Sequence, residues 1–363
     1  MKKSFLLVAL WLLAGCAGAI ITTPADQTTT PSGSAIPPTP IPIQSTATAT
    51  QSIPVTWSGH DLAGHLLLIQ YHETGDTLIE LDLQSGAIRP LFQAENGSKL
   101  LAASLSPDGK MLVLGYAAPT PGQVQLGNTD LYQLQIGSTD PPMLLVKRYS
   151  SDESYFGPVW EPDGKTILYA HFYKILINNN PVYRYRIETI DQTGKELPLI
   201  ADAYRPAISS DGSKISYVYS DPKLQSDDLY ISDASGQKAT ALTTPGVTPP
   251  VDAHFFSKDN QTIFFSMVNP QPQPASDWWD SLFGVKTVSA HNVPSDWYKV
   301  PAAGGKIERV TNVSDTGMSG AISPDGSRLA FISMNGLFAV KTDGSDLVNL
   351  TDTAFEGSIQ WLP

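Results

Sequence analysis

Five segments of the chain share one order of apolar and polar positions: a short apolar stretch, a tight polar turn and a second apolar run. In such a turn, serine can begin a type I turn, proline presets φ, aspartate suits the third position, and glycine or asparagine accepts the left-handed conformation. The apolar run that follows is typical of a β-strand. The five turns are Ser106-Pro107-Asp108-Gly109, Glu161-Pro162-Asp163-Gly164, Ser209-Ser210-Asp211-Gly212, Ser257-Lys258-Asp259-Asn260 and Ser323-Pro324-Asp325-Gly326.

A further aromatic-rich strand and another tight turn follow these strand pairs. Examples are residues 228–243 (DLYISDASGQKATALT), 296–311 (DWYKVPAAGGKIERVT) and 336–351 (GLFAVKTDGSDLVNLT). The repeating unit is therefore strand A, the polar turn, strand B, a loop, strand C, a second turn and strand D. Four antiparallel strands that recur about every 50 residues predict the blades of a β-propeller.

These repeats resemble the PD40 or WD40-like repeats of the TolB propeller and of the propeller in the dipeptidyl peptidase IV family. The resemblance covers about residues 62–363. The alternative is an unrelated β-sandwich with similar turns, but five copies in register favour the propeller.

The two ends of the repeat region complement each other. Residues 64–92 contain strands B, C and D without a strand A, whereas residues 357–363 (GSIQWLP) look like a strand A with nothing after it. Pairing of the last strand with the first blade would close the ring and leave no long exposed edge. We therefore predict an all-β, six-bladed β-propeller of four-stranded antiparallel blades, closed by the C-terminal strand in the N-terminal blade.

The long connections of the repeat region are all of the B–C/D–A type, between strands B and C or between strand D and the next strand A. They are residues 118–129, 173–181, 220–227 and 269–295. In this topology the B–C and D–A connections share one face, and the short A–B and C–D turns lie on the other. Because loops on a rigid scaffold often carry function, we predict that a partner binds the B–C/D–A face.

The N-terminus has the features of an export signal. Lys2 and Lys3 precede an apolar stretch from Phe5 to Leu13, which is too short to span a bilayer. Leu13-Ala14-Gly15-Cys16 resembles the lipobox of bacterial lipoproteins, which implies a signal peptide over residues 1–15 and lipid attachment at Cys16. An ordinary signal peptide with an incidental cysteine is the alternative. We expect an exported protein that is lipid-anchored to the bacterial cell envelope, on its periplasmic side or outer surface.

Composition supports a stalk followed by one folded region. Residues 16–56 are rich in Thr, Pro, Ser and Ala and almost uncharged, so we predict a disordered linker there and the propeller over residues 57–363. The formal net charge is −12 and no Lys/Arg cluster occurs. Nucleic acid is therefore an unsuitable partner, because phosphate binding requires concentrated positive charge.

Signals for catalysis are weak in this sequence. It contains no G-x-S-x-G nucleophile elbow, no H-E-x-x-H motif and no cysteine pair. The hydrolase domain of the dipeptidyl peptidase family and the N-terminal α/β domain of TolB have no counterpart in it, which puts both activities in doubt. We predict no catalytic residue, metal or cofactor.

Aromatic and charged side chains on the B–C/D–A side supply the binding candidates, because rings anchor interfaces and stack on sugars or peptides. The alternative is that the rings pack on their own blade and that the histidine is structural. The repeated Asp108, Asp163, Asp211, Asp259 and Asp325 are predicted to be turn residues. The candidates are Trp278, Trp279, Phe283 and Trp297 in or beside the longest insertion, Tyr155, Phe156, Tyr204 and Arg205 near D–A loops, and Asp252 and His254 in strand A of the fifth blade.

Three functions remain open from the sequence. The leading hypothesis is a non-catalytic binding or scaffold protein whose loop face engages an envelope protein or peptide. The second is a metal-dependent hydrolase or lactonase-type enzyme that uses the central channel. The third is a carbohydrate-binding module, suggested only by the tryptophans.

Overall fold

The computed structural model describes residues 51–52, 61–119, 128–269, 291 and 293–363. These residues form β-strands and turns, arranged as six antiparallel sheets. No helix in these described ranges is long and apolar enough to cross a membrane. The signal peptide, Cys16 and most of the predicted linker lie outside the described residues.

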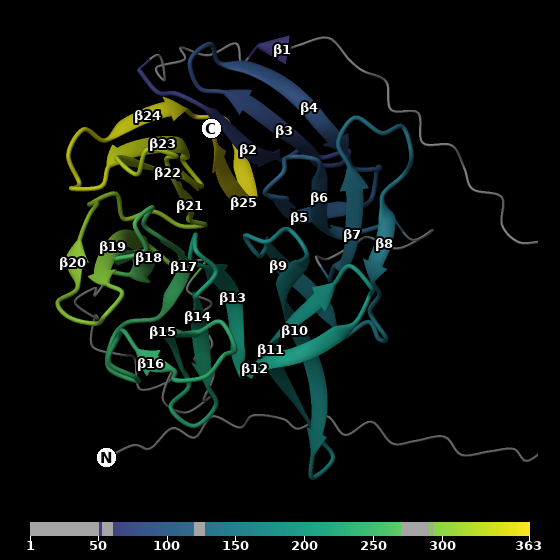
Figure 1. Ribbon diagram of the computed structural model, residues 1–363, viewed down its shortest axis with the longest axis vertical. Helices are drawn as coiled ribbons and strands as arrows, with labels where there is room; N and C mark the ends of the chain where they lie inside the picture. The colour runs from purple at the N-terminus through teal and green to yellow at the C-terminus, as the bar shows by residue number, and fades with distance from the viewer. Residues whose placement is uncertain (1–50, 53–60, 120–127, 270–290, 292) are drawn as a thin grey trace, which may run out of the picture. The chain divides into compact units, whose positions relative to one another are not determined.

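The six sheets are the blades of a propeller, each with strand A innermost (Figure 1). Blade one consists of β2 (His65–Gln70), β3 (Thr77–Asp82), β4 (Ala87–Gln93) and β25 (Phe355–Leu362), and blade two of β5 (Lys99–Leu105), β6 (Met111–Ala117), β7 (Asp130–Gln135) and β8 (Met143–Val146). Blade three consists of β9 (Ser154–Trp160), β10 (Thr166–Ile177), β11 (Asn180–Asp191) and β12 (Glu196–Ala201), and blade four of β13 (Ala203–Ile208), β14 (Lys214–Asp221), β15 (Ser226–Asp233) and β16 (Thr240–Ala241). Blade five consists of β17 (Val251–Phe256), β18 (Thr262–Val268), β19 (Ser295–Pro301) and β20 (Glu308–Arg309), and blade six of β21 (Ser319–Ile322), β22 (Arg328–Ser333), β23 (Gly336–Lys341) and β24 (Val348–Thr351).

The predicted ring closure is confirmed. Strand β25 pairs antiparallel with β2, with Trp361 opposite Leu66 and Gln360 opposite Leu67. Side chains of β25 also reach the next blade: Gln360 Oε1 accepts the backbone N–H of Leu105 at 3.0 Å, and Ser358 Oγ accepts that of Ala103 at 2.8 Å. The last strand therefore completes blade one and ties it to blade two.

Blade one has a fifth strand that the sequence analysis did not anticipate. Strand β1 (Gln51–Ser52) pairs with Ile88 and Ala87 at the outer edge of β4. An outer strand exposes unpaired backbone groups, and a short added strand satisfies part of that edge. The structure therefore differs from the predicted disordered linker at these two residues.

The A–B turns have the predicted geometry. Ser106 Oγ donates to Asp108 Oδ1 at 2.7 Å and accepts the backbone N–H of Met111 at 2.9 Å. Gly109 has a φ of +72°, and Asn260 takes the same place with a φ of +61°. Equivalent serine–aspartate bonds recur in blades four, five and six. The repeated aspartates with these bonds thus stabilise turns, as predicted.

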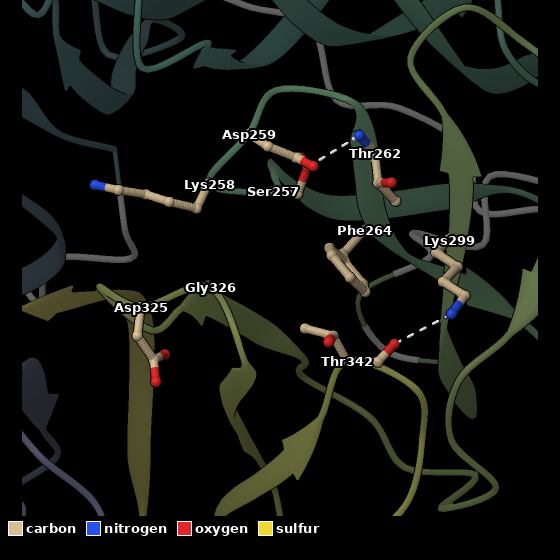
Figure 2. Close-up of a pocket in the computed structure, with 9 residues that line it drawn as sticks. All are labelled: Ser257, Lys258, Asp259, Thr262, Phe264, Lys299, Asp325, Gly326 and Thr342. Carbon is tan, nitrogen blue, oxygen red and sulfur yellow. Dashed lines mark hydrogen bonds between the residues drawn. The ribbon is translucent and has the colours of Figure 1, made fainter.

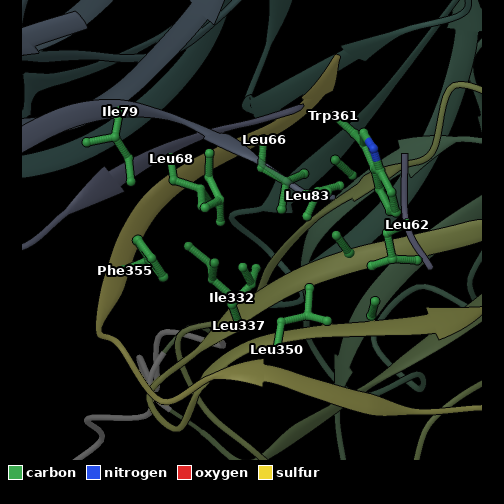
Figure 3. Packing of buried hydrophobic residues seen from close by; sticks show 14 of the residues in the cluster. Leu62, Leu66, Leu68, Ile79, Leu83, Ile332, Leu337, Leu350, Phe355 and Trp361 are labelled. Carbon is green, nitrogen blue, oxygen red and sulfur yellow. The ribbon is translucent and has the colours of Figure 1, made fainter. Parts of the chain in front are cut away.

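The hydrophobic core lies in the interfaces between neighbouring blades. Figure 3 shows the interface of blades one and six, where Leu66 and Leu68 belong to one buried cluster with Ile332 and Leu337. Trp361 belongs to the same cluster, and its Nε1 donates to Ala63 O at 3.0 Å. Burying each such side chain contributes about 1.5–3 kcal/mol. The core thus depends on every blade having a neighbour on both sides.

Candidate binding site at the central channel

A cavity of about 610 Å³ lies among the inner strands of blades one to six. Its size is within the range of about 300–1,000 Å³ that is usual for ligand sites. Short side chains from the inner strands form much of the wall and leave the space open. They include Ala102, Gly157, Ala207, Ala253, Gly320 and Ser358.

The cavity extends from the middle of the inner strands toward the A–B turns. Arg205 lines it at one level, and Ser210, Lys258 and Asn260 of the turns line it at the other. Residues that precede Arg205 in β13 do not contribute to the wall. Arg205 therefore marks the inner end of the cavity, and the turns mark the other end.

Arg205 occupies a backbone position that favours glycine. The pairing of β13 with β14 shifts register between Tyr204 and Ala207, and Arg205 has a φ of +51° in this bulge. Gly157 holds the corresponding place in β9, three residues before the strand ends, with a φ of +57°. A side chain in the left-handed region costs about 1 kcal/mol or more. The surrounding structure keeps an arginine where the neighbouring blade has glycine.

Arg205 and His291 share the carboxylate of Asp252. Arg205 Nε donates to Asp252 Oδ1 at 2.6 Å, and His291 Nδ1 lies 2.7 Å from Oδ2. The side chain of Asp252 is only 8% exposed. Burial by itself would raise the pKa of Asp252, but the Arg205 charge and the His291 hydrogen bond outweigh it and lower that pKa. The carboxylate therefore stays ionised and fixes both neighbouring side chains.

His254 faces the cavity from β17 as a neutral side chain. It lines the cavity, but its Nε2 is buried and has no hydrogen-bond partner within the described residues. Burial is the main cause that lowers the pKa of His254 from 6.5 to about 4. At neutral pH the imidazole is therefore uncharged and contributes polarity rather than charge to the wall.

The lowered pKa of His254 predicts a loss of stability in acid. Between pH 6.5 and about 4, the unfolded chain binds a proton on His254 that the folded chain does not, so the free energy of unfolding falls as the pH falls. We expect the free energy of unfolding of the parent to fall between pH 7 and pH 4 by roughly 2–3 kcal/mol more than that of His254→Gln. Denaturant titrations at pH 7 and pH 4 measure it. The exposed His72→Gln is the control and should behave as the parent; equal acid sensitivity of His254→Gln and the parent would contradict the assignment.

A cluster of aromatic rings lies on the B–C/D–A side of blades three and four. Phe172 stacks on Tyr183 with ring centroids 5.3 Å apart, and Tyr185 lies 5.2 Å from Phe172 and 4.6 Å from Tyr204. The ring of Phe156 meets Tyr185 edge-on at 6.3 Å. The cluster therefore joins β9, β10, β11 and β13. Its last ring, Tyr204, immediately precedes Arg205 in the chain.

The hairpin of β10 and β11 carries this surface away from the ring. Strand β9 pairs with β10 only as far as Phe172, while β10 and β11 stay paired to the two-residue turn at Asn178 and Asn179 (Figure 1). Both turn residues have positive φ, of 51° and 62°. Leu176 is 66% exposed and Tyr183 is 50% exposed. The outer part of the hairpin is thus a two-stranded ribbon with apolar side chains in solvent.

Two of the sequence-based candidates lie in the core. Trp297 is 0% exposed and packs against Phe255 and Phe331, with centroids 5.4 and 6.1 Å away. A Cβ at Gly320 would come within 2.6 Å of the Trp297 ring, so the glycine makes room for it. Tyr155 is 1% exposed and belongs to the core between blades two and three. Both rings pack blades together rather than face a partner.

The remaining candidates divide between the cavity and regions outside the described residues. Arg205 and His254 line the cavity, and Asp252 lies behind Arg205. Phe156 and Tyr204 belong to the aromatic cluster. Trp278, Trp279 and Phe283 lie outside the described residues and stay candidates from the sequence alone.

Sequence reasoning missed His291 and a set of buried aspartates. His291 stands alone in the sequence near the end of the insertion, so only the fold brings it to Asp252. These aspartates lie at or near the start of strand C, and each accepts a backbone N–H of the segment that leads to the next blade. The repeated tripeptides Asp-Leu-Tyr and Asp-Trp-Tyr were the signal for Asp130, Asp228 and Asp296, and Asp76 had no such signal. The bonds join Leu100 N to Asp76, Arg148 N to Asp130, Gly246 N to Asp228 and Val313 N to Asp296, at 2.9, 2.6, 3.3 and 2.6 Å.

A second pocket, of about 570 Å³, lies between the A–B turns of blades five and six (Figure 2). Lys299 Nζ donates to the Thr342 carbonyl oxygen at 3.2 Å, and Ser257 Oγ accepts the N–H of Thr262 at 2.9 Å. Asp259 and Asp325 accept bonds from their own turn serines. These four side chains are therefore engaged in bonds within the protein.

The part of the chain that the structure describes contains no candidate metal centre. No group of three or more His, Cys, Asp or Glu side chains there is arranged to hold a metal ion. The charged side chains that line the cavity are Arg205 and Lys258, which are cations and hydrogen-bond donors.

Comparison with solved structures identifies proteins with the same fold. TolB from Acinetobacter baumannii matches with a TM-score of 0.56 and 15% sequence identity, over 83% of this chain and 67% of that protein. A protein from Agrobacterium tumefaciens described as TolB matches with a TM-score of 0.52 and 18% identity, over 83% of this chain and 99% of its own.

Comparisons of sequence give no match. No family model matches the chain, and no curated protein does. The fold therefore confirms the resemblance to the TolB propeller. Sequence identities of 15% and 18% support a shared fold only.

Proposed function

We propose that the protein is an envelope-anchored, non-catalytic binding or scaffold protein whose propeller engages a protein or peptide. The hairpin of blade three carries the proposal. Soluble proteins rarely expose contiguous apolar surface without a use for it. Here Leu176 and Tyr183 are exposed on the hairpin face that also carries Phe172, and Ile175 and Ile177 are exposed on the opposite face.

The composition of this surface favours a protein or peptide partner. Interfaces are enriched in aromatic side chains and arginine, and large rings act as anchors. The aromatic cluster continues from Tyr183 through Phe172 and Tyr185 to Tyr204, so apolar contact area extends from the hairpin to blade four. An isolated two-stranded ribbon is only marginally stable in water, and a bound partner would stabilise its outer end.

Anchoring through Cys16 completes the proposal. The lipobox-like Leu13-Ala14-Gly15-Cys16 and the Thr/Pro-rich segment after it support a lipidated protein on a spacer, held at the periplasmic side or outer surface of the envelope. Proline-rich spacers extend by about 3.1 Å per residue. A propeller on such a spacer could reach partners well beyond the membrane surface.

Cross-linking from the hairpin tests the proposed function. We expect full-length protein with a photo-cross-linking residue at Leu176 to form one discrete protein adduct in cells of the producing organism. The same residue at Lys110, whose side chain is 75% exposed on an A–B turn, is the matched control and should form none. Adding Tyr183→Ala should weaken the Leu176 adduct about tenfold or more, as expected for loss of a ring worth about 2 kcal/mol.

Two outcomes would contradict the proposed function. One is the absence of an adduct at Leu176 under conditions in which the protein is folded and exported. The other is an equal set of adducts at Leu176 and Lys110, which would indicate unspecific collision. Circular dichroism of the Tyr183→Ala protein separates loss of binding from loss of fold.

A further inference from the structure

We propose that the channel cavity is a second binding site, distinct from the hairpin surface, and that it takes a carboxylate-bearing ligand on Arg205. Arg205 lies at the inner end of the cavity, and Lys258 lies at the end formed by the A–B turns. A ligand that enters past the turns would meet Lys258 first and place its carboxylate on the guanidinium.

The charged side chains of the cavity wall are positive, whereas the net charge of the protein is negative. The chain has 35 acidic and 23 basic residues, with a formal net charge of −12. Yet the charged or ionisable side chains that line the cavity are Arg205, His254 and Lys258, and no Asp or Glu of the described chain is among them. An acidic protein with a cavity of this kind offers an anion a local site that its outer surface does not.

Asp252 binds Arg205 through Nε and leaves the end of the guanidinium group toward the cavity. Its Oδ1 accepts from Arg205 Nε, and its Oδ2 lies against His291 Nδ1, so both oxygens are engaged. Asp252 itself is not part of the cavity wall. Arg205 Nη2 lies 3.5 Å from His291 Nδ1, and the arginine lines the cavity. Guanidinium N–H groups match a carboxylate in geometry. The positive end of the ion pair therefore faces the cavity.

The backbone of Arg205 gives independent support. Its φ of +51° is unfavourable for a residue with a side chain, and the same bulge in blade three has Gly157 with a φ of +57°. A glycine at position 205 would relieve that strain, so the arginine is retained for its side chain, which holds Asp252 and lines the cavity. Unfavourable backbone conformations of this kind cluster at ligand sites.

The length of the cavity suits an extended ligand. Arg205 lies three residues before the end of β13 at Ile208, and strands rise about 3.3 Å per residue. The wall along this strand therefore spans about 10 Å before the turn at Ser210, the length of roughly three extended residues. A peptide with a free C-terminus and a small dicarboxylate share the required chemistry, and the test distinguishes these two sources.

Three probes test the proposal on the full-length protein at low salt. They are N-acetyl-pentaalanine with a free C-terminal carboxylate, the same peptide as its C-terminal amide, and succinate. Trp160 and Trp361 line the cavity, so tryptophan fluorescence can report binding. We expect the carboxylate peptide to bind at least tenfold more tightly than the amide, with affinity that falls as salt rises.

Variants at Arg205 assign the effect to the guanidinium. Arg205→Gly relieves the backbone strain, because glycine adopts the conformation seen at Gly157, and leaves His291 as the partner of Asp252. In the folded variant, the affinity for the carboxylate peptide should fall to that for the amide. Arg205→Lys keeps the charge without the planar fork and should lose part of the preference. Lys110→Ala should bind as the parent. Preference for the peptide over succinate identifies an extended ligand, and equal Arg205-dependent binding of succinate identifies a small carboxylate; both support the carboxylate site.

The proposal is overturned if the parent protein binds the amide as tightly as the carboxylate peptide. Because that comparison needs no variant, it remains decisive even if Arg205→Gly fails to fold. A folded Arg205→Gly protein that keeps the preference, or the absence of saturable binding by all three probes, would also overturn it. These results do not depend on cross-linking at Leu176, so the two proposals can fail separately.

Discussion

Deletion of Gly357 to Pro363 should lower the melting temperature by at least about 10 °C, far more than the loss of seven terminal residues would ordinarily cause. The deletion removes Trp361 from the core between blades one and six and four of the six residue pairs that join β25 to β2. It also removes Ser358 and Gln360, whose side chains bind the backbone of β5 in blade two. The ring then has a gap beside β2.

The expected magnitude follows from the side chains lost. Removing a large buried ring such as that of Trp361 costs about 3–5 kcal/mol by itself, and the lost strand pairing and inter-blade bonds add to it. The total is comparable with the stability of many whole domains, which is about 5–15 kcal/mol. A ring fold has no other element that could replace the missing strand.

Thermal unfolding followed by circular dichroism measures this effect. Deletion of Pro363 alone is the matched control, since this residue is exposed and follows the last strand, and it should leave the melting temperature unchanged. If the protein that lacks Gly357 to Pro363 melts within a degree or two of the parent, β25 does not close the ring in solution.

Cys16→Ser should abolish lipid labelling and release the protein from the membrane fraction or stall its processing. Cys16 is the only cysteine of the chain, so no other thiol can take its place. One acyl chain binds a bilayer only reversibly, whereas several chains on one residue anchor a protein stably. Loss of the thiol should therefore move almost all of the protein from the detergent phase to the aqueous phase.

Metabolic labelling with a radioactive fatty acid and detergent phase partitioning measure this change. Ala19→Ser, which adds a hydroxyl close to the same site and keeps the thiol, is the control and should be labelled and partitioned like the parent. A Cys16→Ser protein that still partitions into detergent would show that another feature holds the protein at the membrane.

The repeats determined the fold because the turn residues and apolar runs within each repeat are sufficient to define its strands. The Ser-Pro-Asp-Gly turns specify where strand A ends and strand B begins, through bonds within a few residues such as that of Ser106 with Asp108. The first repeat has no strand A and the last segment is a single strand A, so β25 was expected to join blade one. Local turn chemistry and the count of strands were therefore sufficient for the architecture and its closure.

The buried state of individual rings depended on the tertiary structure. Trp297 and Tyr155 looked like exposed candidates because a sequence does not tell whether a loop-flanking ring points into the interface between two blades. Gly320, which makes room for Trp297, lies in the next blade, and no sequence spacing reveals that contact. Burial in a propeller is decided between blades, whereas the sequence pattern describes each blade by itself.

The candidate site shows the same division. The sequence drew attention to Arg205 near a D–A loop and to Asp252 and His254 in strand A of the fifth blade, but it did not connect the two places and gave no part to His291. Only ring closure brings six inner strands around one cavity, and only the bulge at Arg205 directs its side chain to Asp252 in the next blade. The sequence by itself determined the blades, their number and their closure, because these follow from local repeats. The tertiary structure decided which side chains meet at the channel, because those contacts join residues whose separation along the chain carries no pattern.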